Sequence, residues 1–153
     1  MSGLLTDARA RWSDPEVARR ILEEFHIWAV VGCSPDPARA SHGVSRTLMA
    51  YGYEMIPIYP RGTTIHGIPT VPELATAAAQ RPPDRPIEVV DIFRASHRAG
   101  AHVDEAIAIG ARAVWMQLDV WDEAAAERAA AAGLLVVMDR CPAIDLPAMT
   151  RGA

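Results

Sequence analysis

The chain has 153 residues with 15 basic and 19 acidic side chains, and every basic residue is an arginine. The formal net charge of −4 argues against non-specific nucleic-acid binding. Without lysine the chain can form neither a phosphate loop that ends in Lys-Ser/Thr nor a Schiff-base nucleophile. A phosphate site must therefore use arginines, hydroxyls or backbone N–H groups.

The length fits one domain, and we expect a single domain over residues 1–153. No apolar run approaches the ~18 residues of a membrane helix, and residues 1–7 lack the basic and apolar regions of a signal peptide. Two cysteines do not suggest a disulfide scaffold. We therefore expect a cytoplasmic protein that binds neither membranes nor nucleic acid.

Short apolar runs rich in β-branched residues alternate with segments of helical spacing along the chain. Ser13, Thr70 and Ser96 are each expected to cap the helix that follows them. Pro57 lies inside an apolar run, where it cannot donate to a neighbouring strand. The chain after residue 138 is expected to form a short tail. The predicted elements are helix 13–25, strand 27–32, helix 43–51, strand 54–59, helix 70–80, strand 87–93, helix 96–110, strand 113–117, helix 122–132 and strand 134–138.

This alternation predicts an α/β fold with a doubly wound, five-stranded parallel sheet between two layers of helices. Numbered along the chain, the strands are most simply ordered 3-2-1-4-5. In such sheets a ligand binds outside the carboxyl ends of the strands, near the point where the strand order reverses. The predicted site therefore lies at the ends of strands one, two and four.

The turn after the first strand indicates a phosphate-binding loop. Gly32 is the first glycine of a dinucleotide fingerprint, and Ser34 stands where that fingerprint has its second. A hydroxyl and free N–H groups before a helix N-terminus suit a phosphate, and Arg39 and Ser41 add donors. The alternative is structural, because any strand-to-helix turn in this fold favours glycine.

The end of the second strand discriminates between cofactors. An NAD-binding chain usually has an acid there for the ribose hydroxyls, whereas this chain has Tyr59, Pro60 and Arg61. An arginine suits a nucleotide with an extra ribose phosphate, which is either NADP or coenzyme A (CoA). Arg61 is alternatively a solvated loop residue.

Other reactive or charged residues give weaker indications. Cys33 lies near a helix N-terminus, where a thiolate is favoured, although an inert residue packed in a turn is the commoner explanation. Arg94 can reach a pyrophosphate, whereas Asp91 fits a hydrogen-bonded strand residue. Arg140 and Cys141 follow the fifth strand, where they either line the site or anchor the tail. The histidines have no metal-binding spacing.

Seven stretches taken together carry a family resemblance. They are residues 29–34 with Pro37, Arg39 and Ser41, residues 51–53 with 56–61, and residues 90–94, 105–111, 114–118 and 136–141. Through them the sequence resembles the small stand-alone CoA-binding proteins, whose Rossmann-like domain is also found at the start of the succinyl-CoA synthetase α-subunit. The resemblance covers about residues 15–149.

The resemblance implies that the loop after the first strand holds the pyrophosphate and that Arg61 recognises the phosphoadenosine end. Residues 93, 94 and 115–117 would border the rest of the ligand. Tyr59 departs from the family, which often has asparagine at this position. The implied CoA-binding residues are Gly32, Cys33, Ser34, Arg39, Ser41, Tyr59, Pro60, Arg61, Phe93, Arg94, Trp115, Met116 and Gln117.

The synthetases also need a second domain with a phosphorylated histidine, which this sequence does not supply. The expected function is therefore binding of CoA or an acyl-CoA through its 3′-phospho-ADP moiety, without catalysis. One alternative is a minimal NADP-dependent oxidoreductase subunit that works with a partner chain. Another is an interaction module whose ligand loop has decayed. The sequence leaves open any protein partner and any self-association.

Overall fold

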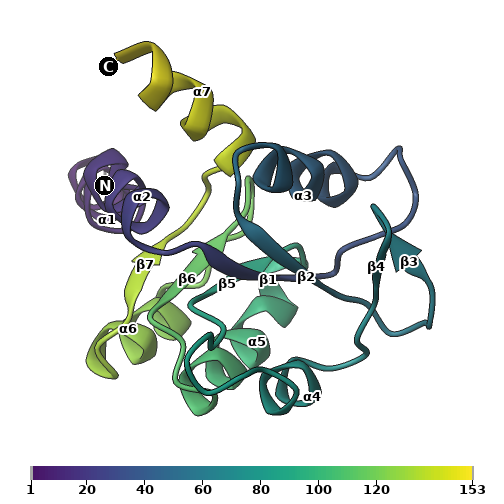
Figure 1. The fold of residues 1–153 in the computed structure, drawn as a ribbon. Coiled ribbons are helices and arrows are strands. Elements are labelled where there is room, and N and C mark those ends of the chain that lie inside the picture. The colour runs from purple at the N-terminus through teal and green to yellow at the C-terminus, as the bar shows by residue number, and fades with distance from the viewer. Residues whose placement is uncertain (1, 153) are drawn as a thin grey trace.

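The computed structural model describes residues 2–152, with side chains for residues 7–149. Helices and strands alternate along most of the chain (Figure 1). The helices are α1 (Ser2–Trp12), α2 (Pro15–Glu24), α3 (Ala40–Ala50), α4 (Leu74–Ala79), α5 (Ser96–Ala108), α6 (Glu123–Ala131) and α7 (Pro142–Gly152). The strands are β1 (Ile27–Val31), β2 (Glu54–Ile58), β3 (Thr64–Ile65), β4 (Ile68–Pro69), β5 (Val89–Ile92), β6 (Ala113–Met116) and β7 (Leu135–Val137).

Five parallel strands form the central sheet in the order β2-β1-β5-β6-β7. Helices α2, α3 and α7 cover one face of this sheet, and α4, α5 and α6 cover the other (Figure 1). The predicted Rossmann-like, doubly wound α/β/α fold is therefore confirmed. The predicted strand order 3-2-1-4-5 is wrong. With the five strands of this sheet numbered one to five along the chain, the observed order is 2-1-3-4-5, and it reverses between β1 and β5.

Pro57 explains why β2 is an edge strand. The N–H of Glu54 donates towards β1, to the His26 carbonyl at 2.8 Å, whereas the N–H of Tyr59 donates outwards, to the Val71 carbonyl at 3.0 Å. Because these directions alternate along a strand, the nitrogen of Pro57 faces outwards, where a sheet edge requires no donor. Strand order 3-2-1-4-5 would have left this position without its ladder hydrogen bond.

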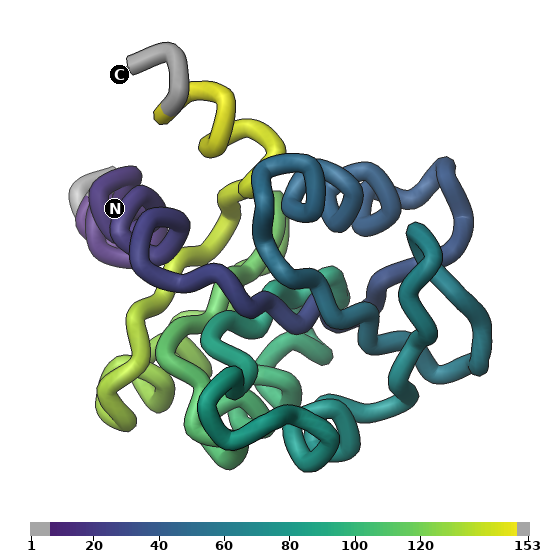
Figure 2. The backbone as a smooth tube through the Cα atoms, in the orientation of Figure 1, coloured from purple at the N-terminus to yellow at the C-terminus, as the bar shows by residue number. Residues whose placement is uncertain are grey.

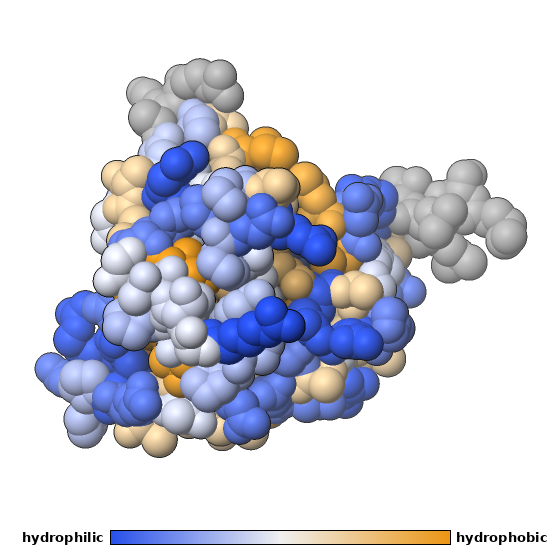
Figure 3. Space-filling view, turned by 90° about the vertical axis from the view of Figure 1, so that its right-hand side faces the viewer, coloured by the Kyte–Doolittle hydropathy of each residue, from blue (hydrophilic) through white to orange (hydrophobic). Residues whose placement is uncertain are grey.

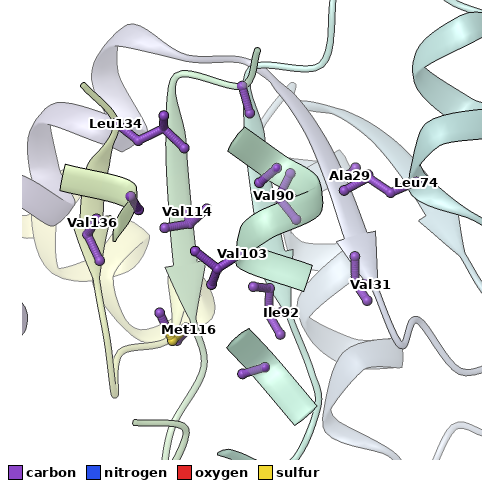
Figure 4. Close-up of a cluster of buried hydrophobic side chains, with 14 of the residues drawn as sticks. Ala29, Val31, Leu74, Val90, Ile92, Val103, Val114, Met116, Leu134 and Val136 are labelled. Carbon is purple, nitrogen blue, oxygen red and sulfur yellow. The ribbon is translucent and has the colours of Figure 1, made fainter. Parts of the chain in front are cut away.

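The core lies on both faces of the sheet, since parallel strands are buried on both sides. Val90, Ile92, Val114 and Met116 point towards α5 and the neighbouring helices, where Val103 packs among them (Figure 4). The alternate positions carry larger side chains to the other face. They include Trp28 and Trp115, whose rings lie 5.6 Å apart between centroids.

A small hairpin formed by β3 and β4 covers the edge of the sheet beside β2. His66 and Gly67 form its two-residue turn with φ angles of 53° and 80°, as tight hairpin turns require. Val71 then pairs with Ile58. The hairpin tip reaches the start of α3 (Figure 2). There the ring centroids of His66 and His42 lie 4.4 Å apart. No strand was predicted between residues 59 and 70.

Helix starts differ from the predicted caps. The Asp14 carboxylate, not Ser13, caps α2 by accepting the N–H of Glu16 at 2.9 Å. The Thr70 hydroxyl instead donates a hydrogen bond to the Arg61 carbonyl in the loop before β3, and α4 begins only at Leu74. Ser96 accepts the N–H of Trp121 and does not cap α5.

Both ends of the chain are more helical than expected. The tail predicted after residue 138 contains α7, and α1 precedes the first predicted helix. The carbonyl of Trp12, at the end of α1, accepts the N–H of Met138 beyond β7.

The face shown in Figure 3 is mostly hydrophilic, with hydrophobic colour in a stripe at the upper right and in smaller patches. Within the described part of the chain, no helix is both long enough and apolar enough to cross a membrane.

Candidate functional site

The candidate site begins where β1 ends between β2 and β5. The N–H groups of Gly32 and Cys33 both donate to the Ile58 carbonyl, at 3.1 and 3.2 Å. On the other side, the N–H of Phe93 donates to the Val31 carbonyl at 2.9 Å. Gly32 has φ +78°, and a Cβ there would lie 2.4 Å from the Phe93 carbonyl oxygen. Only glycine fits this junction without displacing the backbone.

The loop between β1 and α3 is held by its own polar groups. The Ser41 hydroxyl accepts the N–H of Ser34 at 2.9 Å, and the Ser34 hydroxyl accepts the N–H of Asp36 at 3.0 Å. Asp36 in turn accepts the N–H of Ala38 at 2.9 Å. The loop amides that were predicted to be free are therefore mostly engaged, and the loop is organised before any ligand binds.

The first turn of α3 provides N–H groups instead. A helix leaves its first N–H groups without intrahelical acceptors. Among the described residues, no acceptor is found for the N–H of Ala40 or Ser41. Both residues line the cavity described next. The positive end of the helix dipole adds to the attraction of this position for an anion.

A cavity of about 540 Å³ opens along the carboxyl edge of the sheet. Its walls include residues that follow each of the five strands of the sheet. In the order of the sheet, Tyr59 and Pro60 follow β2, Gly32 follows β1 and Arg94 follows β5. Residues after β6 and β7 complete the series. The walls consist of Gly32, Ser34, Arg39, Ala40, Ser41, Tyr59, Pro60, Phe93, Arg94, Ala95, Gln117, Leu118, Val120 and Cys141.

Nine of the thirteen predicted site residues line this cavity. They are Gly32, Ser34, Arg39, Ser41, Tyr59, Pro60, Phe93, Arg94 and Gln117. The other four, Cys33, Arg61, Trp115 and Met116, are not in its walls. Arg61 is exposed in the loop just beyond Pro60, and its carbonyl accepts the Thr70 hydroxyl at 2.8 Å. Trp115 and Met116 are fully buried on opposite faces of the sheet.

The charge of the cavity is opposite to that of the whole chain. Two arginines, Arg39 and Arg94, line it, and no aspartate or glutamate is among the described residues of its walls. Neither arginine forms an ion pair with a described residue, whereas Arg140, for example, pairs with Asp145 at 2.8 Å. The Nε of Arg94 is buried and has no hydrogen-bond partner there. The cavity therefore concentrates unpaired positive charge in a protein of net charge −4.

Gln117 adds an unsatisfied acceptor to the same cavity. Only 5% of this residue is exposed, and its Oε1 atom is buried without a hydrogen-bond partner in the described structure. Buried polar atoms of native proteins are nearly always hydrogen-bonded, so Gln117 fits a site completed by a donor from a ligand or a water molecule.

Burial raises the pKa values of two titratable groups near the site, Cys33 in the loop and Asp91 in β5. Burial raises the pKa of the Cys33 thiol to about 11, because the charged form loses its solvation. Burial likewise raises the pKa of Asp91 well above its ordinary value, and neither of its carboxyl oxygens has a partner in the described structure. Cys33 therefore fits the commoner explanation, a residue packed in the turn with no favoured thiolate, whereas the Asp91 carboxyl is not hydrogen-bonded to any described residue as its strand position had suggested.

Sequence reasoning missed Leu118 and Val120 in the cavity and left Cys141 undecided between site and tail. The signal for Cys141 was its place after the fifth strand, at the edge where ligands bind. Among the described residues, no three His, Cys, Asp or Glu side chains are grouped to hold a metal ion.

Residues 26–147 match the protein family described as CoA binding domain, and the chain belongs to this family. The uncharacterised protein YneT of Bacillus subtilis (strain 168) is 32% identical over 123 residues, which are 80% of this chain and 87% of YneT. A solved structure of a hypothetical protein from Pyrococcus horikoshii OT3 is 32% identical with a TM-score of 0.78, covering 89% of this chain and 92% of its own. Cell-free ID.343 from Thermus thermophilus is 28% identical with a TM-score of 0.76, covering 89% and 98%.

Proposed function

We propose that the cavity binds CoA or an acyl-CoA through its 3′-phospho-ADP moiety. The observation that carries this proposal is that two arginines without ion-pair partners among the described residues, Arg39 and Arg94, line a cavity whose described walls hold no carboxylate. Membership of the CoA binding domain family supports the same ligand. A polyanion gains most from this site, because the positive field is confined to one concave part of a negatively charged protein.

The pyrophosphate is assigned to the junction of β1, β5 and α3. There Arg94 and two first-turn residues of α3, Ala40 and Ser41, line the same cavity. Charge-assisted hydrogen bonds from a guanidinium and from helix N-terminal amides are the strongest contacts that a lysine-free chain offers to phosphate.

The 3′-phosphate is assigned to Arg61, outside the cavity walls. Arg61 follows Pro60, which does line the cavity, so a ligand whose adenosine end leaves the cavity at β2 passes this guanidinium. Because Arg61 is exposed, its contact is screened by solvent, and we expect a contribution of about 1 kcal/mol or less.

We further propose that the protein binds CoA or acyl-CoA without catalysing its turnover. The described cavity walls hold no carboxylate and no imidazole to act as general acid or base. Cys33 and Asp91 are fully buried outside these walls, and burial raises the pKa of each, which favours the protonated form. NADP binding with a partner chain is the alternative, because Arg61 also suits a 2′-phosphate.

Isothermal calorimetry with CoA, dephospho-CoA, NADP and NAD tests this proposal. We expect CoA to bind most tightly, and a preference for NADP would contradict it. Arg61→Ala should weaken CoA binding about two- to fivefold and leave dephospho-CoA binding unchanged. Arg46→Ala is the matched control, since Arg46 is also exposed and unpaired among the described residues but lies outside the cavity walls. Equal losses for both ligands would show that Arg61 does not read the 3′-phosphate.

A further inference from the structure

Cys141 is the cavity's one cysteine among its described walls, at the end remote from β2. It directly precedes α7, and its carbonyl accepts the N–H groups of Ile144 and Asp145 at 3.0 and 2.9 Å. These bonds fix its backbone at the cavity wall, where the residue is 7% exposed. Cys33, the other cysteine, is fully buried outside the walls, and its thiol stays protonated. The two cysteines therefore differ in access to anything that fills the cavity.

Gln117 independently indicates that a ligand extends to this end. The segment before Cys141 runs beside the end of β6, since Arg140 donates its N–H to the Met116 carbonyl at 3.4 Å and accepts the Trp115 indole N–H at 2.8 Å. The buried, unpartnered Oε1 of Gln117 and the side chain of Cys141 thus belong to the same part of the cavity. Leu118 and Val120 supply apolar wall there.

The order of the strands gives this arrangement a direction. Neighbouring strands lie about 4.8 Å apart, so β6, beside which the segment before Cys141 runs, lies one such step from β5. With the phosphates of CoA at β1 and β5, its arm continues towards β6 and β7. That arm has amide N–H groups, which match the Gln117 acceptor, apolar methylenes, which match Leu118 and Val120, and a terminal thiol, which approaches Cys141.

We infer that Cys141 undergoes thiol–disulfide exchange with the disulfide form of CoA, an inference that rests on the proposed function. The Cys141 sulfur, after losing its proton to solvent, attacks one sulfur of the CoA disulfide. A Cys141–CoA disulfide bond forms while the S–S bond of the reagent breaks. The second CoA leaves as a thiolate and takes a proton from solvent, so no other oxidant is needed. The CoA disulfide is reduced by one thiol, and the protein retains one CoA covalently.

Intact-mass spectrometry with peptide mapping tests this inference on the full chain. Reduced protein, freed of reductant, is incubated with CoA disulfide. We expect one CoA adduct, located on Cys141 and removed by dithiothreitol. Cys33→Ala should keep the adduct, and Cys141→Ala should lose it. Because prior binding makes the exchange effectively intramolecular, CoA disulfide should react at least about tenfold faster than glutathione disulfide, which has no phosphates to bind. Excess adenosine 3′,5′-bisphosphate should remove this preference.

Three results would overturn the inference: no adduct, an adduct on Cys33, or equal rates with the two disulfides. Peptide mapping of the unmutated chain locates the adduct even where a cysteine variant folds poorly. Calorimetry with reduced CoA on the same preparation separates the two proposals. If reduced CoA binds but Cys141 does not react preferentially, only the exchange fails. If reduced CoA does not bind, the proposed function fails as well.

Discussion

Replacing Asp91 by asparagine should change how the stability of the protein depends on pH. Asp91 is fully buried, and both of its carboxyl oxygens lack partners in the described structure. Burial raises its pKa well above the ordinary carboxyl value, so the folded state holds a proton that the unfolded chain releases near pH 4. The stabilisation from that proton is complete below the unfolded pKa and is lost as pH rises towards the folded pKa.

The expected slope follows from one proton. Within this window the wild-type free energy of unfolding should fall by about 1.4 kcal/mol per pH unit relative to Asp91→Asn, because the amide does not titrate. Urea unfolding of both proteins at half-unit steps from pH 4.5 upwards measures this difference. Asp84→Asn is the control, since Asp84 is exposed. A difference between wild type and Asp91→Asn that stays constant with pH would show that Asp91 holds no extra proton in the folded state.

Two further substitutions test the junction and the charge of the cavity. Gly32→Ala places a Cβ 2.4 Å from the Phe93 carbonyl oxygen, whereas Gly110→Ala meets no atom within 4 Å at the same φ of +78°. Thermal unfolding should therefore show a larger loss for Gly32→Ala, and equal losses would mean that the close approach does not matter. Arg94→Gln should weaken CoA binding about ten- to hundredfold in calorimetry, whereas the exposed Arg98→Gln should not; similar effects would remove Arg94 from the site.

Local patterns were enough to predict the main elements of the fold. The runs that contain Val90 and Val114 are continuous and apolar because parallel strands are buried on both faces. Strand order depends on which neighbours pair, a long-range property that periodicity does not encode. Pro57 did indicate one part of the strand order, since proline suits an edge strand and β2 lies at the edge of the sheet. The β3–β4 hairpin was missed because strands of two residues leave no repeating pattern.

Most residues predicted after strands one to three line the cavity, although Cys33 and Arg61 lie outside its walls. At β6 the predicted residues and the cavity walls differ by position. Trp115 and Met116 still lie within the strand and point into the two cores, whereas Gln117, one residue further, reaches the cavity. Cys141 comes four residues after β7, and its place in the wall depends on how the chain returns beside β6. Such a return is set by tertiary packing.

A crystal structure of the protein grown with CoA shows whether the cavity at the carboxyl edge of the sheet is the CoA site. We expect pyrophosphate oxygens within hydrogen-bond distance of the Arg94 guanidinium and the first-turn N–H groups of α3. The arm of CoA should pass Gln117 towards Cys141. CoA bound away from the carboxyl edge of the sheet, or an empty cavity at saturating CoA, would contradict the proposed function.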